Sequence, residues 1–427
     1  MKTNALLFAF LTIAVGMNAQ KTTKKQLPSP YATKSVTNYS NVIGWKEGET
    51  PKAPEGFMVT KYADGFDNPR WMYVTPNGDV LVAESNSNYS IPKQVGAAII
   101  GAGKSNELSH SADMIVLLRD TDHDGKPDVR EAFATKENGL NQPFGMLVIG
   151  DWFYVGNTDA LLRFPYKKGQ TKLEGKGEKL LELPAGKHNR HWTRNLIANA
   201  DHSKIYIAVG SGTNVAEEGF ENEINRADIL EINPDGSGLQ VYASGLRNPV
   251  GMDWAPGTKT LWTAVNERDE LGNNLVPDYL TSVKQGGFYG WPYSYWGQNV
   301  DPRVKPQKPE LVKKTIVPEV DLGSHTASLG LTFYTGKSFP DKYKNGAFIA
   351  QHGSWNRDPI SGYKVVFVPF AAGKPSGKAE DFLTGFVVDP NKNEVRGRPV
   401  GIIQLPDGSL LLTDDKTNNI WRISYYK

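Results

Sequence analysis

The chain has 427 residues, of which 39% are hydrophobic and 11% aromatic, and it carries a formal net charge of +2 and no cysteine. The near-neutral charge excludes the electropositive surface that a nucleic-acid-binding protein needs. The lack of cysteine excludes disulfides, iron–sulfur ligation, c-type haem attachment and a cysteine nucleophile. The 43 glycines and 27 prolines supply the turns that many short strands need.

The first 19 residues have the form of a secretory signal. Lys2 gives a positive start, residues 5–16 form an apolar run, and Ala19 offers a small residue at a cleavage point. The apolar run is too short to span a bilayer, and no later segment is suited to do so. Residues 20–52 are rich in Lys, Thr, Ser and Pro, which predicts a linker or an N-terminal arm. We therefore expect an exported chain, periplasmic or secreted, without a membrane span.

From residue 53 to residue 427 one pattern recurs, with a polar start, an apolar strand, a turn and a second apolar strand. In the clearest copy, Pro406-Asp407-Gly408 separates two apolar runs, which predicts a hairpin. The copies start near Asn68, Gln142, His191, Arg247, Leu329 and Arg396. Repeats with several strands each are typical of propeller blades. The sequence therefore predicts an all-β fold, a six-bladed β-propeller.

Residues 120–131 have the spacing of a calcium-binding loop. Carboxylates occupy positions 1, 3, 5, 9 and 12 of this loop, and Gly125 at position 6 permits the sharp turn. Because the flanking residues predict strands, we expect a structural ion rather than a catalytic one. An acidic hairpin turn without an ion is the alternative. The candidate ligands are Asp120, Asp122, Asp124, Lys126, Asp128 and Glu131.

Histidine and arginine recur where the repeats begin. Residues 187–194 contain two histidines and three cations just before a predicted strand. In a propeller such a position lies beside the central channel, where the imidazole of His191 could accept a proton at neutral pH. A basic surface loop is the alternative. Arg396 and Arg398 form an i, i+2 pair that would point to one side of a strand and suit a polycarboxylate or a phosphate.

An aromatic run at residues 288–296 could stack on a planar cofactor or a sugar, or pack between blades. Three motifs, one of which overlaps this run, resemble those of the soluble quinoprotein sugar dehydrogenases of the glucose/sorbosone dehydrogenase type. These motifs are residues 245–251 (Gly-Leu-Arg-Asn-Pro-Val-Gly), residues 286–292 (Gly-Gly-Phe-Tyr-Gly-Trp-Pro) and the Arg396–Arg398 pair. The pattern from about residue 57 to residue 427 is most similar to the L-sorbosone dehydrogenase branch.

The resemblance implies that pyrroloquinoline quinone (PQQ) lies across the channel mouth on a calcium ion. A sugar aldehyde or aldose would pass hydride to the quinone, and the electrons would leave to an external acceptor, a cytochrome or a quinone. His191 would deprotonate the sugar hydroxyl, beside Ser211 where glucose-oxidising members carry an aspartate. Arg247 would lie at the reactive quinone carbonyl. The backbone of Glu267 and Arg268 would hold the cofactor calcium. The implied cofactor-binding residues are Arg247, Asn248, Asn266, Trp355, Asn356, Arg357, Arg396 and Arg398.

Two other functions remain open from the residues alone. A metal-dependent lactonase on the same fold needs carboxylate and amide ligands that converge on one ion. Glu84, Asn157, Asn266 and Asp414 stand at comparable ends of the repeats. A non-catalytic carbohydrate- or protein-binding propeller would tolerate replacement of His191.

Overall fold

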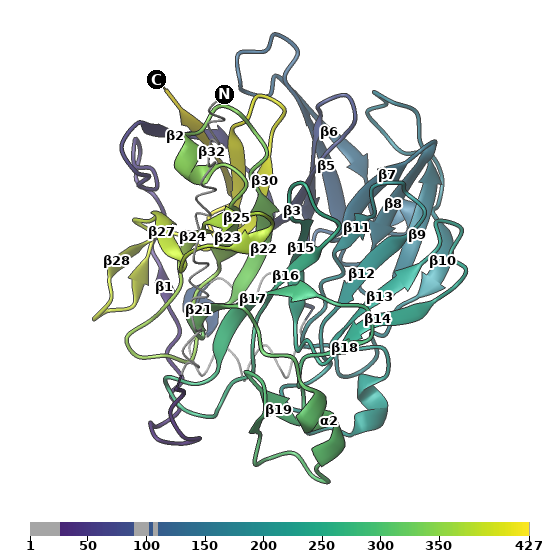
Figure 1. The fold of residues 1–427 in the computed structure, drawn as a ribbon. Helices are drawn as coiled ribbons and strands as arrows, with labels where there is room; N and C mark the ends of the chain where they lie inside the picture. Colours follow the sequence, from purple (N-terminus) through teal and green to yellow (C-terminus); the bar gives the residue numbers. More distant parts are fainter. Residues whose placement is uncertain (1–25, 89–101, 106–109, 427) are drawn as a thin grey trace, which may run out of the picture.

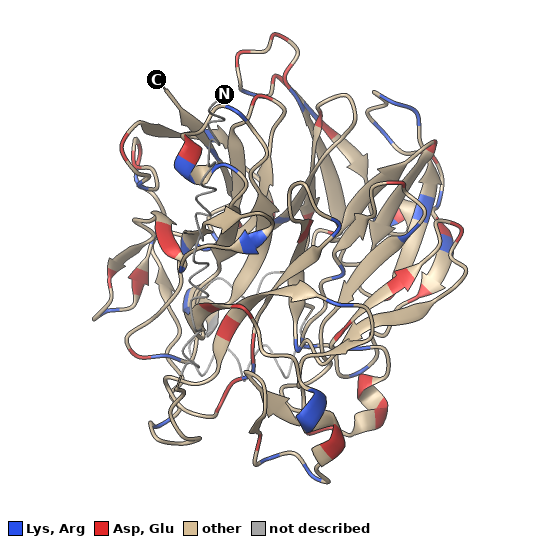
Figure 2. Cartoon of the chain, viewed as in Figure 1, with Lys and Arg blue, Asp and Glu red and all other residues tan. Residues whose placement is uncertain are grey.

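The computed structural model describes residues 26–88, 102–105 and 110–426 (Figure 1). The predicted signal segment, residues 1–19, lies outside the described residues. Within the described ranges, no helix is long and apolar enough to cross a membrane. Lys, Arg, Asp and Glu are spread over many loops and strands (Figure 2).

Five four-stranded sheets and one five-stranded sheet contain most of the strands of the described chain, which confirms the all-β class. In order across each sheet, the strands are β3 (Pro69–Val74), β4 (Val80–Glu84), β5 (Met114–Arg119) and β6 (Val129–Ala134); β7 (Met146–Ile149), β8 (Trp152–Gly156), β9 (Ala160–Pro165) and β10 (Glu178–Glu182); β11 (Leu196–Ala198), β12 (Ile205–Val209), β13 (Asp228–Ile232), β14 (Gln240–Ser244) and β18 (Gly287–Phe288); β15 (Pro249–Trp254), β16 (Leu261–Val265), β17 (Pro277–Val283) and β21 (Val320–Ser324); β22 (Ser328–Phe333), β23 (Ala347–Gln351), β24 (Lys364–Val368) and β27 (Glu380–Leu383); β30 (Pro399–Gln404), β31 (Leu410–Asp414), β32 (Asn419–Tyr425) and β2 (Phe57–Ala63).

Smaller elements decorate these sheets. They are the strands β1 (Asn41–Val42), β28 (Val387–Asp389) and β29 (Glu394–Val395), the pairs β19 (Ser294–Tyr295) with β20 (Asn299–Val300) and β25 (Phe370–Ala371) with β26 (Lys374–Pro375), the helix α2 (Pro309–Lys314), and the 3-10 turns η1 (Ala102–Ser105), η2 (Lys136–Asn138), η3 (Phe220–Glu223) and η4 (Asp341–Tyr343).

Each predicted repeat gives an antiparallel pair of strands, namely β3–β4, β7–β8, β11–β12, β15–β16, β22–β23 and β30–β31. In the last pair, Gly408 adopts φ 85°, and the Asp407 carboxylate accepts a hydrogen bond from the Ser409 backbone at 2.8 Å. The Asp-Gly turn therefore closes the hairpin as the sequence predicted.

The first strands of these pairs contact one another in a closed ring, in the order β3, β7, β11, β15, β22, β30 and back to β3. Glycines recur where the ring strands meet. A Cβ on Gly251 would lie 2.5 Å from the Leu329 carbonyl oxygen, and one on Gly330 would lie 2.3 Å from the Val400 carbonyl oxygen. Only glycine permits backbones to approach this closely, which explains the glycine that follows the start of several repeats.

The first and the last strand of the propeller sheets join one sheet, because β2 pairs with β32 in antiparallel register, from Phe57 opposite Tyr425. This pairing leaves the ring of sheets closed and covers two strand edges. The predicted arm packs against the body rather than extending from it. Tyr39 stacks on Trp355 with ring centroids 5.7 Å apart, and Trp45 donates a hydrogen bond to Asp414 at 2.8 Å.

Candidate active site

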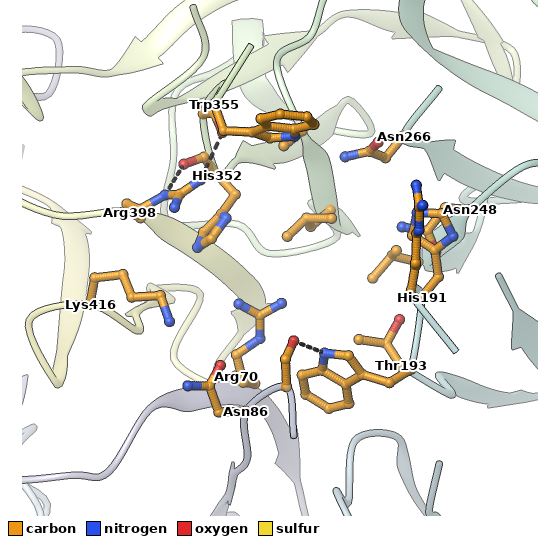
Figure 3. A pocket seen from close by; sticks show the side chains of 17 residues that line it. Arg70, Asn86, His191, Thr193, Asn248, Asn266, His352, Trp355, Arg398 and Lys416 are labelled. Atoms are coloured by element: carbon orange, nitrogen blue, oxygen red, sulfur yellow. Dashed lines mark hydrogen bonds between the residues drawn. The ribbon is translucent and has the colours of Figure 1, made fainter. Parts of the chain in front are cut away.

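A cavity of about 200 Å³ opens where the ring strands begin and where their hairpin partners end (Figure 3). Its polar walls therefore come from segments far apart in sequence. Arg70 belongs to β3, and the other polar lining residues used below are His191, Asn248, Asn266, His352, Trp355, Arg398 and Lys416. In Figure 3, Arg398, His352 and Lys416 lie across the cavity from His191 and Asn248.

The imidazole of His191 is oriented by the backbone after β12. Its Nδ1 lies 2.8 Å from the Ser211 carbonyl oxygen and 3.0 Å from Ser211 Oγ. A carbonyl oxygen only accepts, so Nδ1 carries the proton and Nε2 is the acceptor of a neutral ring. A Cβ on Gly210 would lie 2.4 Å from both His191 Cβ and Asn248 Oδ1. Glycine at this position therefore lets the two side chains stand together at the cavity wall.

Burial, and then the positive charge of Arg247, hold the pKa of His191 well below its ordinary value of 6.5. The ring is consequently neutral at neutral pH and can accept a proton. Ser211 supplies the fixed acceptor through its carbonyl and hydroxyl oxygens, so the base is oriented without a carboxylate at this position.

Arg247 does not line the cavity, because its guanidinium is buried in a network of its own. It donates to the Glu267 carbonyl at 2.6 Å, to Asn266 Oδ1 at 3.2 Å and to Asn214 Oδ1 at 2.8 Å, and lies 3.1 Å from Asp269. Arg247 thus fixes Asn266, which does line the cavity, and places a positive charge near His191.

The stretch predicted to hold the cofactor calcium contains one buried guanidinium group, that of Arg268, and contacts a second, that of Arg247. The Glu267 carbonyl already accepts a hydrogen bond from Arg247, and the Glu267 side chain pairs with Arg268 at 2.9 Å. Arg268 is 0% exposed and also lies 3.4 Å from Asp301. A calcium ion on these carbonyls would have to displace one buried cation and lie beside another, so the residues present do not fit that ion.

The two arginines of the C-terminal repeat separate in the structure. Arg398 is buried at the cavity and donates to the backbone oxygens of His352 and Gly353 at 3.0 and 2.9 Å. Arg396 instead turns to the N-terminal arm, where it pairs with Glu49 at 2.6 Å. Strand β29 ends at residue 395 and β30 begins at residue 399, so the two arginines lie in a loop. The alternation of a strand therefore does not apply, and the expectation of a same-side pair is wrong.

The remaining implied cofactor residues divide in the same way. Asn248, Asn266 and Trp355 line the cavity. Asn356 is buried and donates to Asp269 Oδ1 at 2.7 Å, and Arg357 donates to a backbone oxygen of the loop after β16 at 3.2 Å, so neither side chain lines it.

The aromatic run at residues 288–296 packs inside the protein. The Tyr289 hydroxyl donates to the Ser282 carbonyl and the Trp291 indole donates to the Asn214 carbonyl at 2.5 and 2.9 Å, and neither ring lines the cavity. The packing alternative holds for these side chains.

Sequence reasoning missed three cavity residues that cluster around one buried carboxylate. Arg70 Nη1 lies 2.6 Å from Asp415, Lys416 Nζ lies 3.3 Å from it, and His352 Nε2 lies 2.8 Å from it. Arg70 follows the proline that begins β3, whereas Arg247 and Arg398 precede the prolines that begin β15 and β30. An arginine within two residues of the proline that begins a ring strand was the available signal.

The residues of the predicted calcium loop lie between β5 and β6, so the flanking strands form as expected. Ligand atoms of Asp120, Asp122 and Asp124 all lie within 4.8 Å of one another. The Gly125 backbone adopts φ 87° and donates to Asp120 Oδ2 at 2.8 Å. The other predicted ligands do not join this group. The Asp128 carboxylate instead accepts a hydrogen bond from the Thr121 backbone at 3.0 Å.

Two family sequence models match the chain. The model described as Glucose / Sorbosone dehydrogenase matches residues 152–354, and the TrAA12-like model matches residues 310–426. The pyrroloquinoline quinone-dependent pyranose dehydrogenase of Coprinopsis cinerea is 31% identical over 290 residues, which cover 53% of this chain and 38% of that protein. The matched part thus spans well under two thirds of that relative.

Two solved structures share the fold at low sequence identity. The holo form of the PQQ domain of the Coprinopsis cinerea enzyme superposes with a TM-score of 0.68 at 19% identity, covering 90% of this chain and 100% of that one. The calcium structure of a family AA12 carbohydrate-active enzyme from Trichoderma reesei gives a TM-score of 0.70 at 16% identity, covering 95% and 100%. The chain therefore shares the fold of these proteins, and its residues 152–354 are similar to the glucose/sorbosone dehydrogenase family.

Proposed function

We propose that the chain is a six-bladed propeller that oxidises a sugar aldehyde or an aldose with PQQ as hydride acceptor. The observation that carries this proposal is the cavity itself. On one wall stands a neutral imidazole, His191, with its accepting nitrogen free of the Ser211 contacts. On the opposite wall stand the cations Arg398 and Lys416, and Arg70 lies between the two walls.

The blade count rests on the closed ring of β3, β7, β11, β15, β22 and β30. Each ring strand starts one sheet of four or five strands, and the sheet that pairs β2 with β32 closes the circle. This arrangement supports six blades with the cavity at one end of the central channel.

The cavity residues fit a flat polycarboxylate such as PQQ. Three cations suit its carboxylates, because guanidinium and ammonium groups form strong charge-assisted hydrogen bonds to carboxylate oxygens. Two buried polar atoms at the cavity residues, Arg70 Nε and Asn248 Oδ1, have no hydrogen-bond partner within the described ranges. A bound polar ligand is a natural partner for such atoms. Trp355, stacked on Tyr39, offers an aromatic face at the same cavity.

In the proposed reaction, His191 Nε2 takes the hydroxyl proton of the sugar while the carbinol carbon loses hydride. PQQ, when bound, supplies the two-electron acceptor for that hydride. The Ser211 carbonyl holds the proton on Nδ1, so the ring orientation is fixed before the proton moves. Arg247 keeps His191 neutral in the resting state by its charge. Removal of the electrons requires an external acceptor, a cytochrome or a quinone, and we propose that the exported chain meets it in the periplasm or outside the cell.

We further propose that Asp120, Asp122 and Asp124 bind a structural calcium ion. Calcium should raise the melting temperature, because an ion at 100 times its Kd stabilises a fold by about 2.7 kcal/mol. Asp122→Asn should abolish most of this rise, measured by differential scanning fluorimetry with calcium or chelator. The matched control is Asp201→Asn, since Asp201 holds the turn at Ser203 and lies outside this group. An unchanged rise of the melting temperature with calcium in Asp122→Asn would contradict calcium binding at this loop.

The alternative metal-dependent lactonase is not favoured by the geometry. Among the described residues, the His, Asp and Glu group that could hold a metal lies in the Asp120 loop and not at the cavity. Asp414, one of the candidate ligands, instead accepts hydrogen bonds from Trp45 and from the Arg398 backbone, both at 2.8 Å.

One experiment distinguishes the non-catalytic carbohydrate-binding function from the proposed enzyme. Apo-protein is titrated with PQQ, and sugars are then added with an artificial electron acceptor.

A further inference from the structure

A second imidazole lines the cavity opposite His191, and the reaction proposed above does not use it. His352 follows β23, and its Nε2 lies 2.8 Å from Asp415 Oδ1. Asp415 follows β31 and is 1% exposed. Its other oxygen accepts a hydrogen bond from Arg70 at 2.6 Å and lies 3.3 Å from Lys416 Nζ. His352 therefore contacts a buried carboxylate that two cations also contact.

This contact determines where the proton of His352 resides. Although burial opposes ionisation, Lys416 and Arg70 help to hold the pKa of Asp415 well below its ordinary value of 3.8. An ionised carboxylate only accepts hydrogen bonds, so His352 Nε2 is the protonated nitrogen. The other nitrogen, Nδ1, is then an acceptor in the neutral ring. It has no hydrogen-bond partner within the described ranges, and the side chain lines the cavity.

Four charged groups face His352 from the segments packed around it. They are Asp415 and Lys416 after β31, Arg398 before β30, and Arg70 in β3. Burial and the positive charge of Arg398 lower the pKa of His352 to about 3, with Arg70 acting in the same direction and Asp415 opposing it. An anion that binds these cations would cancel much of the repulsion that keeps the ring neutral.

We propose that a polycarboxylate bound in the cavity promotes the uptake of a proton on Nδ1 of His352 at acidic pH, so that binding and protonation are coupled. The proton comes from solvent and forms one new N–H bond, at Nδ1. The Nε2–H group of His352 keeps its hydrogen bond to Asp415. The imidazolium then adds a positive donor toward the ligand. Because such coupling is reciprocal, the affinity for the ligand rises as the pH falls. The inference deepens the proposed function, because PQQ is a polycarboxylate.

The direct test follows the pKa of His352 by NMR of ¹⁵N-labelled histidine side chains, with and without benzenetricarboxylate and, separately, PQQ. Either anion should raise this pKa by about 2, the effect of cancelling a unit charge about 5 Å away at an effective dielectric constant of about 20. The His352→Gln variant identifies the resonance. The exposed His202 is the internal control that should not shift. Binding without a shift of His352, or no binding of either anion, overturns the inference.

A second measurement compares the pH dependence of PQQ affinity in the wild-type protein and in His352→Gln. The ligand's own carboxylates titrate equally with both proteins, so the difference in slope isolates His352. Between the pKa of about 3 without ligand and the value about 2 higher with ligand, wild-type affinity should increase more steeply with acidification, by up to about tenfold per pH unit, because one proton is taken up. Equal slopes would contradict the coupling. If benzenetricarboxylate binds and shifts His352 but PQQ does not bind, this inference stands and the proposed function fails.

Discussion

Replacement of His191 by glutamine should lower the rate of sugar oxidation by about 10²- to 10⁴-fold, the usual contribution of a positioned general base. Glutamine can still donate to the Ser211 carbonyl, so the cavity wall is preserved while the proton acceptor is lost. PQQ affinity should change little, because the cations Arg398 and Lys416 stand on the opposite wall. The measurement is kcat with the reconstituted protein, alongside a PQQ titration.

The matched control is His188→Gln in the same loop. His188 lies 3.9 Å from Glu218 and does not line the cavity, so this variant should keep its activity. The pH profile provides a second readout. Burial and Arg247 hold the pKa of His191 below 6.5, so the base stays deprotonated until the pH falls through that lowered value. The acid limb of kcat/KM should therefore lie below pH 6.5. Full activity of His191→Gln would contradict the assignment.

Replacement of Arg70 and Arg398 by glutamine should weaken PQQ binding by about 10²- to 10⁴-fold. Each charge-assisted hydrogen bond contributes about 1.5 to 3 kcal/mol, and 1.4 kcal/mol corresponds to a factor of ten. Each single variant should lose about 10- to 100-fold by the same arithmetic. The measurement is the Kd of PQQ from absorbance or fluorescence titration.

Arg396→Gln is the control for this pair, because it removes the same charge from the neighbouring position. Arg396 pairs with Glu49 in the N-terminal arm and is not a cavity residue. Its loss should leave the Kd unchanged and cost at most about 1 kcal/mol of stability, as for other partly exposed ion pairs. Equal losses of affinity in Arg396→Gln and Arg398→Gln would show that the overall charge of the protein, and not contacts in the cavity, governs PQQ binding.

Sequence alone could predict the strands of this fold because each repeat carries its own turn chemistry. The hairpin around Asp407 and Gly408 depends on local φ preferences and on a side chain two residues from its partner. The same locality explains the three aspartates of the Asp120 loop. Asp128 was predicted as a ligand but does not join these aspartates. Its carboxylate accepts a hydrogen bond from the Thr121 backbone, which competes with any ion for its oxygens.

The site was harder to predict because its contacts join distant residues. His352 and Asp415 are 63 positions apart, and Arg70 and Asp415 are 345 positions apart. No local pattern reports such pairs. Arg396 illustrates a different error. The side-chain alternation of a strand was assumed for Arg396 and Arg398, but both residues lie in a loop between strands. Arg247 was expected at the cavity, yet its five donors are used by backbone and side-chain oxygens around Glu267 and Asp269.

The most direct test of the account is a titration of purified apo-protein with PQQ, with and without calcium, followed by absorbance. Aldoses and sorbosone-like aldehydes are then added with an artificial electron acceptor. We predict saturable binding of one PQQ, lost in the variant lacking Arg70 and Arg398, and bleaching of the quinone by at least one sugar, lost in His191→Gln. Failure of PQQ to bind the wild-type protein under either condition would contradict the central claim.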